Sequence, residues 1–387
     1  HLLLGVTRVF LKKFEESEGE FSKAFELMRD EERTPYEDIS SLLPPDMKEL
    51  YLTSTTEKKI EWNRKFWAES DPTPSTEINE RRIEHYKRVF LANALLTNKR
   101  LGLKGEETHR GKALIRYGLP HKKYFDLASG LVGPWLIWRY EFPHLAFNLY
   151  FQDEFLNGNF HIPIKEKILG KKTAQLMENI PQNYEFPIKY KLLPICVKSA
   201  QTRCIGEKTR LEFSIGITNS ILKSEKGDWD LFLTFFDQDW NRISNDHFMF
   251  RPDTLLNIDK LGERFAVINF WLELLPRPIG CVCVLEIIHD SSKYKGVCRY
   301  PLEIRNLFGR SLKLSSIKFT VPDIDGTCSN VLDPIPVYGN FETLCLSYQI
   351  YNLKRDENNL SRYRLTYIIK NPEDREEENT GIRKTLS

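Results

Sequence analysis

The sequence has no apolar run near the roughly 20 residues that a membrane-spanning helix requires, and its charges nearly cancel at a net +2. A chain without a bulk charge is not drawn to nucleic acid or to an anionic membrane by its overall field. It also starts at His1, without a methionine, a basic region or a cleavage site. We therefore expect a piece of a longer or processed protein, whose targeting signal lies outside this sequence.

Cysteine is missing from the first half of the chain, since all seven cysteines lie between Cys196 and Cys345. None forms a C-x-x-C pair, and Cys281 and Cys283 share one face of an expected strand. We expect mostly buried apolar thiols, with one or two disulfides if the protein is exported. An odd count leaves at least one cysteine outside any intramolecular pair.

Catalytic signatures are missing as well. The sequence contains no GxSxG, Walker or GxGxxG motif, and its eight histidines show no HExxH or other metal spacing. A calcium-like start at Asp237 has Arg242 where the loop needs glycine and Phe248 where it needs glutamate, so we expect a β-turn there. The sequence thus predicts no catalytic residue, no metal and no cofactor.

Helical periodicity dominates the first hundred residues. We expect two helices in 1–28 separated at 16–20, a connector at 34–54 broken at Pro44 and Pro45, and helices at 56–69 and 76–96. The last helix is expected to pack one face inward and to pair Glu84 with Arg88 on its solvent side, and the inward residues are Ile83, Tyr86, Phe90 and Ala94. Leu4, Gly5, Phe21 and Ala24 resemble the second half of a tetratricopeptide repeat signature.

From residue 112 the apolar period changes to two, which predicts strands at 112–117, 135–142 and 145–155. Residues 188–307 predict one antiparallel sandwich of immunoglobulin-like size. Its clearest alternation is Leu211, Phe213, Ile215 and Ile217. Residues 308–371 predict a second β unit with three strands, too few for a free sandwich, and 372–387 predict a disordered charged tail.

Several stretches carry further motifs in a fixed order: Phe66-Trp67, Asp71-Pro72-Thr73-Pro74, Asn79-Glu80, His85-Tyr86, Arg88-Val89, Arg110-Gly111, Ile115-Arg116-Tyr117-Gly118 with Pro120, the strand 135–142, and 312–319. Together they resemble the GWxTD domain family, a bacterial family whose members often carry tetratricopeptide repeats before the domain and β-sandwich segments after it. The resemblance implies an architecture and suggests export. It implies no activity, because none is established for the family.

The chain departs from the motif that names the family. Gly105 and Thr108 are retained, whereas Glu106 replaces the tryptophan and His109 replaces the aspartate. If the tryptophan and the aspartate of the family motif form a functional site, this chain has lost that site. If the tryptophan only fills space in the core and the aspartate only caps a helix, the rest of the fold tolerates both replacements.

Residues 105–118 therefore have two interpretations. They could form a catalytic loop with Glu106 or Glu107 as base, His109 as acid–base and Arg110 as anion clamp. We favour a helix-to-strand corner, in which Gly105 and Gly111 adopt positive φ and Thr108 is a cap. In that corner Arg110 or Arg116 would pair with Glu80 or Glu84.

A group of aromatic residues nearby is expected to be core, with a glycan-stacking surface as the alternative: Trp62, Phe66, Trp67, Trp135 and Trp138.

The sequence predicts a multidomain α+β protein with a tetratricopeptide-like segment and connector (1–54), a GWxTD-like module (55–187), the sandwich (188–307), an incomplete β unit (308–371) and the tail. We expect a non-catalytic scaffold that organises other proteins, in a homo- or hetero-oligomeric assembly without nucleic acid, through helical-repeat and β-edge contacts. The alternative is an envelope carbohydrate-binding or carbohydrate-processing protein that uses the Trp cluster and the carboxylates at 106–107.

The motif residues expected to be structural are Gly105, Thr108, Arg110, Gly111, Arg116, Tyr117, Gly118, Trp67, Asp71, Pro72 and Tyr86. The interaction candidates are Leu344, Leu346, Tyr348, Ile350, Tyr363 and Tyr367. The compartment is unknown from the residues, and periplasm or cell envelope is suspected from the resemblance.

Overall fold

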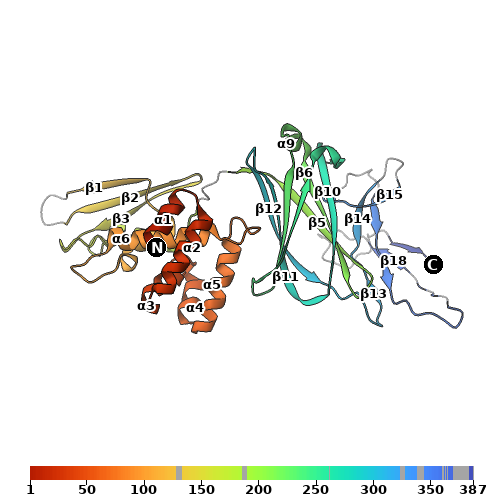
Figure 1. The fold of residues 1–387 in the computed structure, drawn as a ribbon, viewed down its shortest axis with the longest axis horizontal. Coiled ribbons are helices and arrows are strands. Elements are labelled where there is room, and N and C mark those ends of the chain that lie inside the picture. Colours follow the sequence, from red (N-terminus) through yellow and green to blue (C-terminus); the bar gives the residue numbers. More distant parts are fainter. Residues whose placement is uncertain are drawn as a thin grey trace. The chain divides into compact units, whose positions relative to one another are not determined.

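A computed structural model describes residues 1–127, 133–184, 190–260, 262–322, 327–337, 344–359, 361, 363, 365–368 and 383–386. They form a mixture of helices and strands, which confirms the mixed α and β class (Figure 1). Contacts divide the chain into two compact units. The first comprises His1–Leu193, Lys226–Arg251 and Cys281–Leu302, and the second Pro194–Glu225, Pro252–Gly280 and Glu303–Ser387. None of the helices in the described ranges combines the length and apolar character that crossing a bilayer requires.

The first unit begins with six helices: α1 (Leu2–Phe10), α2 (Phe14–Leu27), α3 (Asp30–Glu37), α4 (Pro45–Thr53), α5 (Thr56–Ser70) and α6 (Glu80–Leu96). The helices expected at 56–69 and 76–96 are confirmed as α5 and α6. Thr55 and Asn79 start them, because their side chains accept hydrogen bonds from backbone amides of the first helical turn.

The expected helix break at 16–20 is wrong, because these residues lie inside α2. Ser17 is fully buried there and donates a hydrogen bond of 2.9 Å to the carbonyl of Gly5, which fastens α2 to α1. The two helices are instead separated at residues 11–13. A polar, glycine-containing stretch thus remains helical where tertiary packing uses its small residues.

Three further predictions for the helices are wrong. The expected connector at 34–54 contains the end of α3 and the whole of α4, because Pro45 lies in the first turn of α4, where its missing N–H costs nothing. Glu84 and Arg88 do pair at 2.9 Å, but their side chains are only 12% and 6% exposed, so the pair is not on the solvent side. Ala94 is exposed rather than inward.

The strand expected at 112–117 is also wrong, because these residues belong to helix α7 (His109–Tyr117). A single 3-10 turn, η1 (Gly105–Glu107), precedes it. Consecutive residues from Ala113 to Tyr117 are buried, so the apparent alternation did not mark one face of a strand. Gly118, with φ of 80°, ends the helix.

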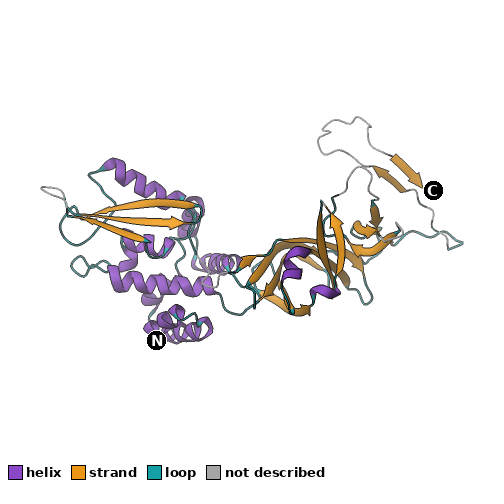
Figure 2. Ribbon diagram, turned by 90° about the horizontal axis from the view of Figure 1, so that it is seen from above, coloured by secondary structure: helices purple, strands orange, loops and turns teal. Residues whose placement is uncertain are grey.

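A three-stranded antiparallel sheet follows, with β1 (Lys122–Asp126), β2 (Trp135–Phe142) and β3 (Leu145–Gln152) in that order. Figures 1 and 2 show the strands side by side along the helices. The strands expected at 135–142 and 145–155 are confirmed, whereas β1 and helix α8 (Lys167–Asn179) were not predicted. The sheet and helices share one core, in which the rings of Tyr140 and Phe147 stack 5.2 Å apart.

The next strands form two larger sheets, and their bounds are β4 (Lys191–Leu192), β5 (Ile195–Arg203), β6 (Thr209–Thr218), β7 (Trp229–Phe236), β8 (Arg242–Phe250), β9 (Leu256–Lys260), β10 (Glu263–Leu274), β11 (Arg277–His289) and β12 (Tyr294–Ile304), with α9 (Asn219–Ser224) and η2 (Pro252–Thr254) between them. One sheet has the order β5-β6-β10-β9 and the other β4-β12-β11-β7-β8. The four apolar residues of the alternation predicted for β6, Leu211, Phe213, Ile215 and Ile217, are buried, but Ser214 and Gly216 between them are buried too, so burial alternates only in the first half of the strand.

After residue 307 the strands are short: β13 (Lys313–Leu314), β14 (Lys318–Pro322), β15 (Cys328–Leu332), β16 (Cys345–Ser347), β17 (Ile350–Tyr351), β18 (Leu365–Ile368) and β19 (Arg383–Leu386). The three longer strands expected here are therefore wrong in detail, and β19 lies in the segment expected to be disordered. A disulfide joins Cys328 in β15 to Cys345 in β16, both paired with β14. Cys281 and Cys283 are buried thiols, as expected, but the expectation is wrong for Cys196, which is exposed, and for Cys204 and Cys298, which are half-buried.

Candidate functional site

Residues 105–111 form a tightly packed helix-to-helix corner. A Cβ on Gly105 would lie 1.9 Å from the carbonyl oxygen of Ala92, and one on Gly111 would lie 1.8 Å from that of Gly105. Both glycines are therefore required for close backbone approach, and the expectation of positive φ is wrong for both. Thr108 is a cap, as expected, because its hydroxyl accepts from the Gly111 amide at 2.9 Å and donates to the Gly105 carbonyl at 2.7 Å.

Arg116 holds this corner against two other segments. Its guanidinium donates to the carbonyls of Ser41 at 2.7 Å, Leu43 at 3.2 Å and Ile180 at 2.9 Å. The expected pairing with Glu80 or Glu84 is therefore wrong, since backbone carbonyls take its donors. The neighbouring hydroxyl of Tyr117 donates to the same Ile180 carbonyl at 3.0 Å.

The polar residues of the corner do not form a reactive group. The ring of His109 accepts a hydrogen bond of 3.3 Å from the Ile162 amide, and burial lowers its pKa. Glu107 accepts from the Lys104 amide at 2.7 Å, and burial raises the pKa of Glu106. Arg110 lies over the Phe160 ring at 5.0 Å, with its charge against an aromatic face. The corner therefore supports the structural interpretation.

The Asp-Pro-Thr-Pro motif lies in the loop between α5 and α6. Side chains of β8 and β12 donate to its carbonyls: Arg299 to Asp71 at 2.6 Å, Lys295 to Pro72 at 2.7 Å, Arg242 to Pro74 at 2.8 Å and to Thr76, and Asn245 to Ser75 at 2.7 Å. Prolines suit this role, because they fix the chain in extended form and leave the carbonyls as its polar groups. The motif fastens the helices to the sheet of the same unit.

Three buried carboxylates surround this loop: Asp71, Glu80 and Glu286. Burial and, to a smaller extent, the other two carboxylates raise the pKa of Asp71 to about 7 against the opposing hydrogen bond from the Thr73 amide. Glu286 is paired with Lys295 and accepts from the Ser75 amide at 3.0 Å. Thr73 binds the other two carboxylates, through its amide to Asp71 at 2.9 Å and through its hydroxyl to Glu80 at 2.5 Å.

Trp67, Asp71 and Tyr86, three of the motif residues, line one cavity of about 750 Å³ in the first unit. Two of its arginines have partners in the protein, since Arg82 lies 2.6 Å from Glu18 and Arg242 binds the loop carbonyls.

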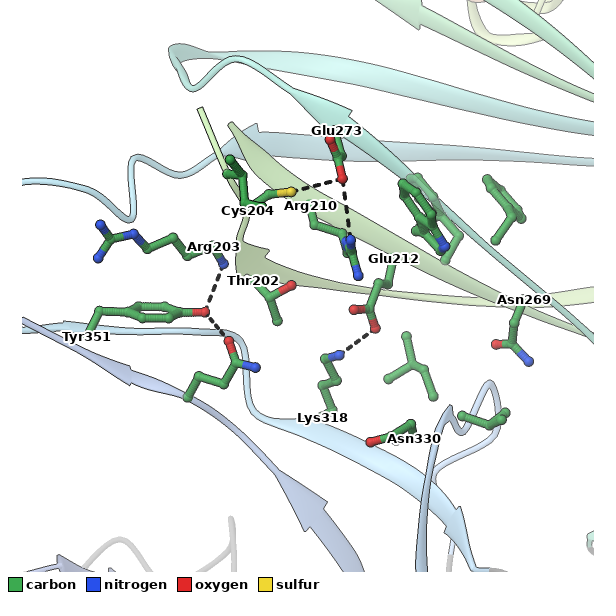
Figure 3. A pocket seen from close by; sticks show the side chains of 17 residues that line it. Thr202, Arg203, Cys204, Arg210, Glu212, Asn269, Glu273, Lys318, Asn330 and Tyr351 are labelled. Atoms are coloured by element: carbon green, nitrogen blue, oxygen red, sulfur yellow. Dashed lines mark hydrogen bonds and ion pairs between the residues drawn. The ribbon is translucent and has the colours of Figure 1, made fainter. Parts of the chain in front are cut away.

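A larger groove of about 860 Å³ lies in the second unit (Figure 3). Strands β5, β6 and β10 supply one side of it, and β14, β15 and residues 349–351 supply the other. The register of the sheet sets Thr202 and Glu273 opposite Arg210, and Trp271 opposite Glu212. Opposed residues on neighbouring strands point to the same face, so all five side chains are gathered there.

The charges in the groove are paired around one exposed aromatic ring. Glu273 lies 3.3 Å from Arg210 and accepts a hydrogen bond of 2.8 Å from the Cys204 thiol, and these two contacts, the thiol first, lower its pKa. Lys318 lies 2.5 Å from Glu212. Figure 3 shows both pairs. Trp271 is 55% exposed, and the Arg210 guanidinium lies 4.4 Å from its ring centre.

Tyr351 connects the two sides of the groove. Its hydroxyl accepts from the Arg203 amide at 2.8 Å and donates to the Gln349 side chain at 2.5 Å. The Arg203 guanidinium lies 4.6 Å from the Phe308 ring. No histidine occurs among the described residues that line the groove.

The sequence did not single out these groove residues. The available signal was the polar half of the alternation in β6, where Arg210 and Glu212 alternate with buried Leu211 and Phe213. In the sequence, this polar face of β6 looks like an ordinary solvent-exposed face. The strands that line the other side of the groove, β14 and β15, lie more than a hundred residues further along the chain.

None of the six interaction candidates is among the described residues that line the groove. Leu344, Leu346 and Tyr363 are exposed, Ile350 is half-buried in β17, and Tyr348 lies between β16 and β17. Tyr367 lies in β18 opposite Lys384, and its side chain is outside the described part of the chain. Their neighbours Gln349 and Tyr351 contribute to the groove instead. Across the described ranges, no group of three or more His, Cys, Asp or Glu residues is placed to hold a metal ion.

No protein-family model and no curated protein matches the chain. Solved structures are similar only in part. A glycosyl hydrolase family 2 member from Bacteroides cellulosilyticus is 14% identical over 30% of this chain and 15% of its own, with a TM-score of 0.23. The β-glucuronidase of Bacteroides uniformis is 10% identical over 28% and 13%, with a TM-score of 0.20. A Northeast Structural Genomics Consortium target is 14% identical over 30% and 90%, with a TM-score of 0.19. Similarity this low carries no argument about function.

Proposed function

We propose that the protein is a non-catalytic binding protein that holds partner proteins in an assembly, with the groove of the second unit as the partner site. The observation that carries the proposal is the exposed Trp271 among fixed, paired charges. Trp, Tyr and Arg are the residues that contribute most at protein interfaces, and the groove has Trp271, Tyr351, Arg203 and Arg210. A carboxylate with a lowered pKa, such as Glu273, is a poor proton donor near neutral pH.

The architecture predicted from the sequence supports this function and remains a proposal. It includes membership of the GWxTD family, the tetratricopeptide-like segment, the immunoglobulin-like sandwich, and domain boundaries near residues 54, 187, 307 and 371. Export is also proposed, and the disulfide between Cys328 and Cys345 supports it, since disulfides persist in oxidising compartments.

Carbohydrate binding is the second candidate, and it is favoured by the same exposed Trp271 beside the amides of Asn269 and Asn330. The residues first considered for it are less suitable. Trp67 and Trp138 belong to the core, as expected. A glycan site would therefore use Trp271.

The test is gentle purification of the chain from its native extract, with mass spectrometry of the proteins that co-elute. We expect a stoichiometric partner whose affinity falls at least about tenfold in Trp271→Ala. Arg264→Ala is the matched control, because Arg264 is exposed on the same strand and lies outside the groove. A partner retained by Trp271→Ala, or a chain without partners, contradicts the proposal. Glycan-array binding that is lost in Trp271→Ala would support the second candidate.

A further inference from the structure

Strand β1 is an unprotected sheet edge. It pairs with β2 alone, so within the described residues no strand lies along its other side. All five of its residues, Lys122–Asp126, are exposed. Such an edge presents backbone donors and acceptors that can pair with another chain. Tyr124 is 52% exposed and Phe125 58%, which gives the edge apolar area as well.

The sequence of β1 is complementary to itself. In an antiparallel pair of two copies centred on Tyr124, Lys122 of each copy lies opposite Asp126 of the other, and Lys123 lies opposite Phe125. Opposite charges and cation–ring neighbours are favourable cross-strand pairs. We propose that two copies of this chain associate through β1, so that their three-stranded sheets join into one continuous antiparallel sheet.

The charges needed for this contact are accessible. The Asp126 side chain is exposed at the end of β1. Lys122 is 3.0 Å from Glu141 in an exposed pair, and its ammonium has further donors. Each protomer therefore offers one exposed carboxylate and one accessible ammonium at the positions where the partner copy supplies the opposite charge.

The geometry of the sheet selects this register over its neighbours. Lys123 and Phe125 point to the core side, where Lys123 lies 5.8 Å from the Trp138 ring centre and Phe125 lies 5.9 Å from that of Phe160. A register shifted by one residue would place the core side of the partner copy's β1 on the other face of the joined sheet, away from Lys123 and Phe125 of the first copy.

A register shifted by two residues keeps the core sides of both copies on the same face, but it separates Lys122 from Asp126 of the other copy. A shift in one direction places Lys123 opposite Lys123 of the other copy, and a shift in the other direction places Asp126 opposite Tyr124. Only the register centred on Tyr124 both aligns the two core faces and places Lys122 opposite Asp126 of the other copy.

The contact is independent of the groove, which lies in the other unit and contains none of these residues. It therefore goes beyond the proposed function, and either proposal can fail alone. Trp271→Ala should leave the association between copies unchanged.

Sedimentation equilibrium of the full chain over a concentration series tests the proposal. We expect a concentration-dependent dimer that Asp126→Lys weakens at least about tenfold, because lysine then lies opposite lysine. The double variant with Lys122→Asp and Asp126→Lys restores opposite charges, so it should recover most of the wild-type affinity. Arg264→Asp, a charge reversal at an exposed position of β10 in the second unit, should have no effect.

Circular dichroism confirms that each variant is folded before the masses are compared. A wild-type chain that stays monomeric at every concentration overturns the proposal. So does an Asp126→Lys variant that dimerises like the wild type, or a double variant that stays as weak as the single one.

Discussion

At the scale of single residues, glycines and buried charges decide how the motif stretches are used. Gly105 and Gly111 are needed because a carbonyl oxygen occupies the space of a Cβ, and Gly118 because its φ is 80°. A sequence shows a glycine without showing which of these reasons applies. Residues 105–118 were predicted to form a structural corner, but the positive φ predicted for Gly105 and Gly111 was wrong.

Gly111→Ala should lower the free energy of unfolding by more than about 2 kcal/mol, because the backbone of η1 must move to admit the new carbon. The measurement is urea denaturation followed by circular dichroism. Gly19→Ala is the control, since nothing lies within 4 Å of its Cβ position in the exposed face of α2. It should raise stability by up to about 1 kcal/mol. Equal effects of the two substitutions would contradict the packing argument.

The buried Asp71 should make stability depend on pH. Its pKa rises from an ordinary 3.8 to about 7 in the folded chain, so the folded state binds the proton more tightly. The resulting stabilisation is complete below about pH 4 and is lost as the pH rises through about 7, at about 1.4 kcal/mol for each pH unit between these values.

Unfolding of wild type and Asp71→Asn at pH 5 and pH 8 measures this effect. We expect the wild type to lose more stability than the variant between the two values. Asparagine keeps an acceptor for the Thr73 amide but cannot ionise. An identical pH dependence in both proteins would show that Asp71 does not titrate in this range.

At the scale of elements, long periodic segments were predicted and short ones were not. Helices α5 and α6 and strand β6 have enough turns or alternations to show their period. Helix α7 has nine residues, and its apolar stretch is buried on several sides, so the same letters fit a strand. Strand β1 is wholly exposed and has no apolar pattern to detect.

Arg116→Lys should destabilise the contact among α7, the loop before α4 and the end of α8. The ammonium group of a lysine cannot donate to carbonyls in both segments, so carbonyl oxygens near Ser41 and Ile180 lose their donors. We expect the free energy of unfolding to fall by about 2–4 kcal/mol. Arg33→Lys is the control, because Arg33 makes exposed ion pairs with Asp30 and Glu37. It should change stability by less than about 0.5 kcal/mol. The measurement is denaturant unfolding, and equal losses would argue against the anchoring role.

At the scale of the whole molecule, the chain crosses between its two compact units several times, so neither unit is one continuous stretch. The Asp-Pro-Thr-Pro loop shows the consequence, since side chains more than 150 residues away complete its hydrogen bonds. Boundaries drawn along the sequence could not anticipate this, because they assume that neighbours in sequence stay together.

Reduction of the disulfide between Cys328 and Cys345 should loosen the second unit alone. Closing a loop of 17 residues contributes about 3 kcal/mol by restricting the unfolded chain. Hydrogen exchange followed by mass spectrometry should show faster exchange in β14 to β16 after reduction and unchanged exchange in α6. Cys196→Ser controls for loss of an exposed thiol. Unchanged exchange in β14 to β16 would contradict the prediction.

The sequence by itself determined the mixed α and β class, the longer helices and strands, the capping role of Thr108 and the buried aromatic core. These features follow from periodicity and local hydrogen bonding, which neighbouring residues contain. Tertiary structure decided the rest: the helical form of 109–117, the packing glycines, the anchored proline loop, and the groove of Arg210, Glu212 and Trp271. Each depends on a contact between segments distant in sequence, and the free energy of such a contact appears only when the segments meet.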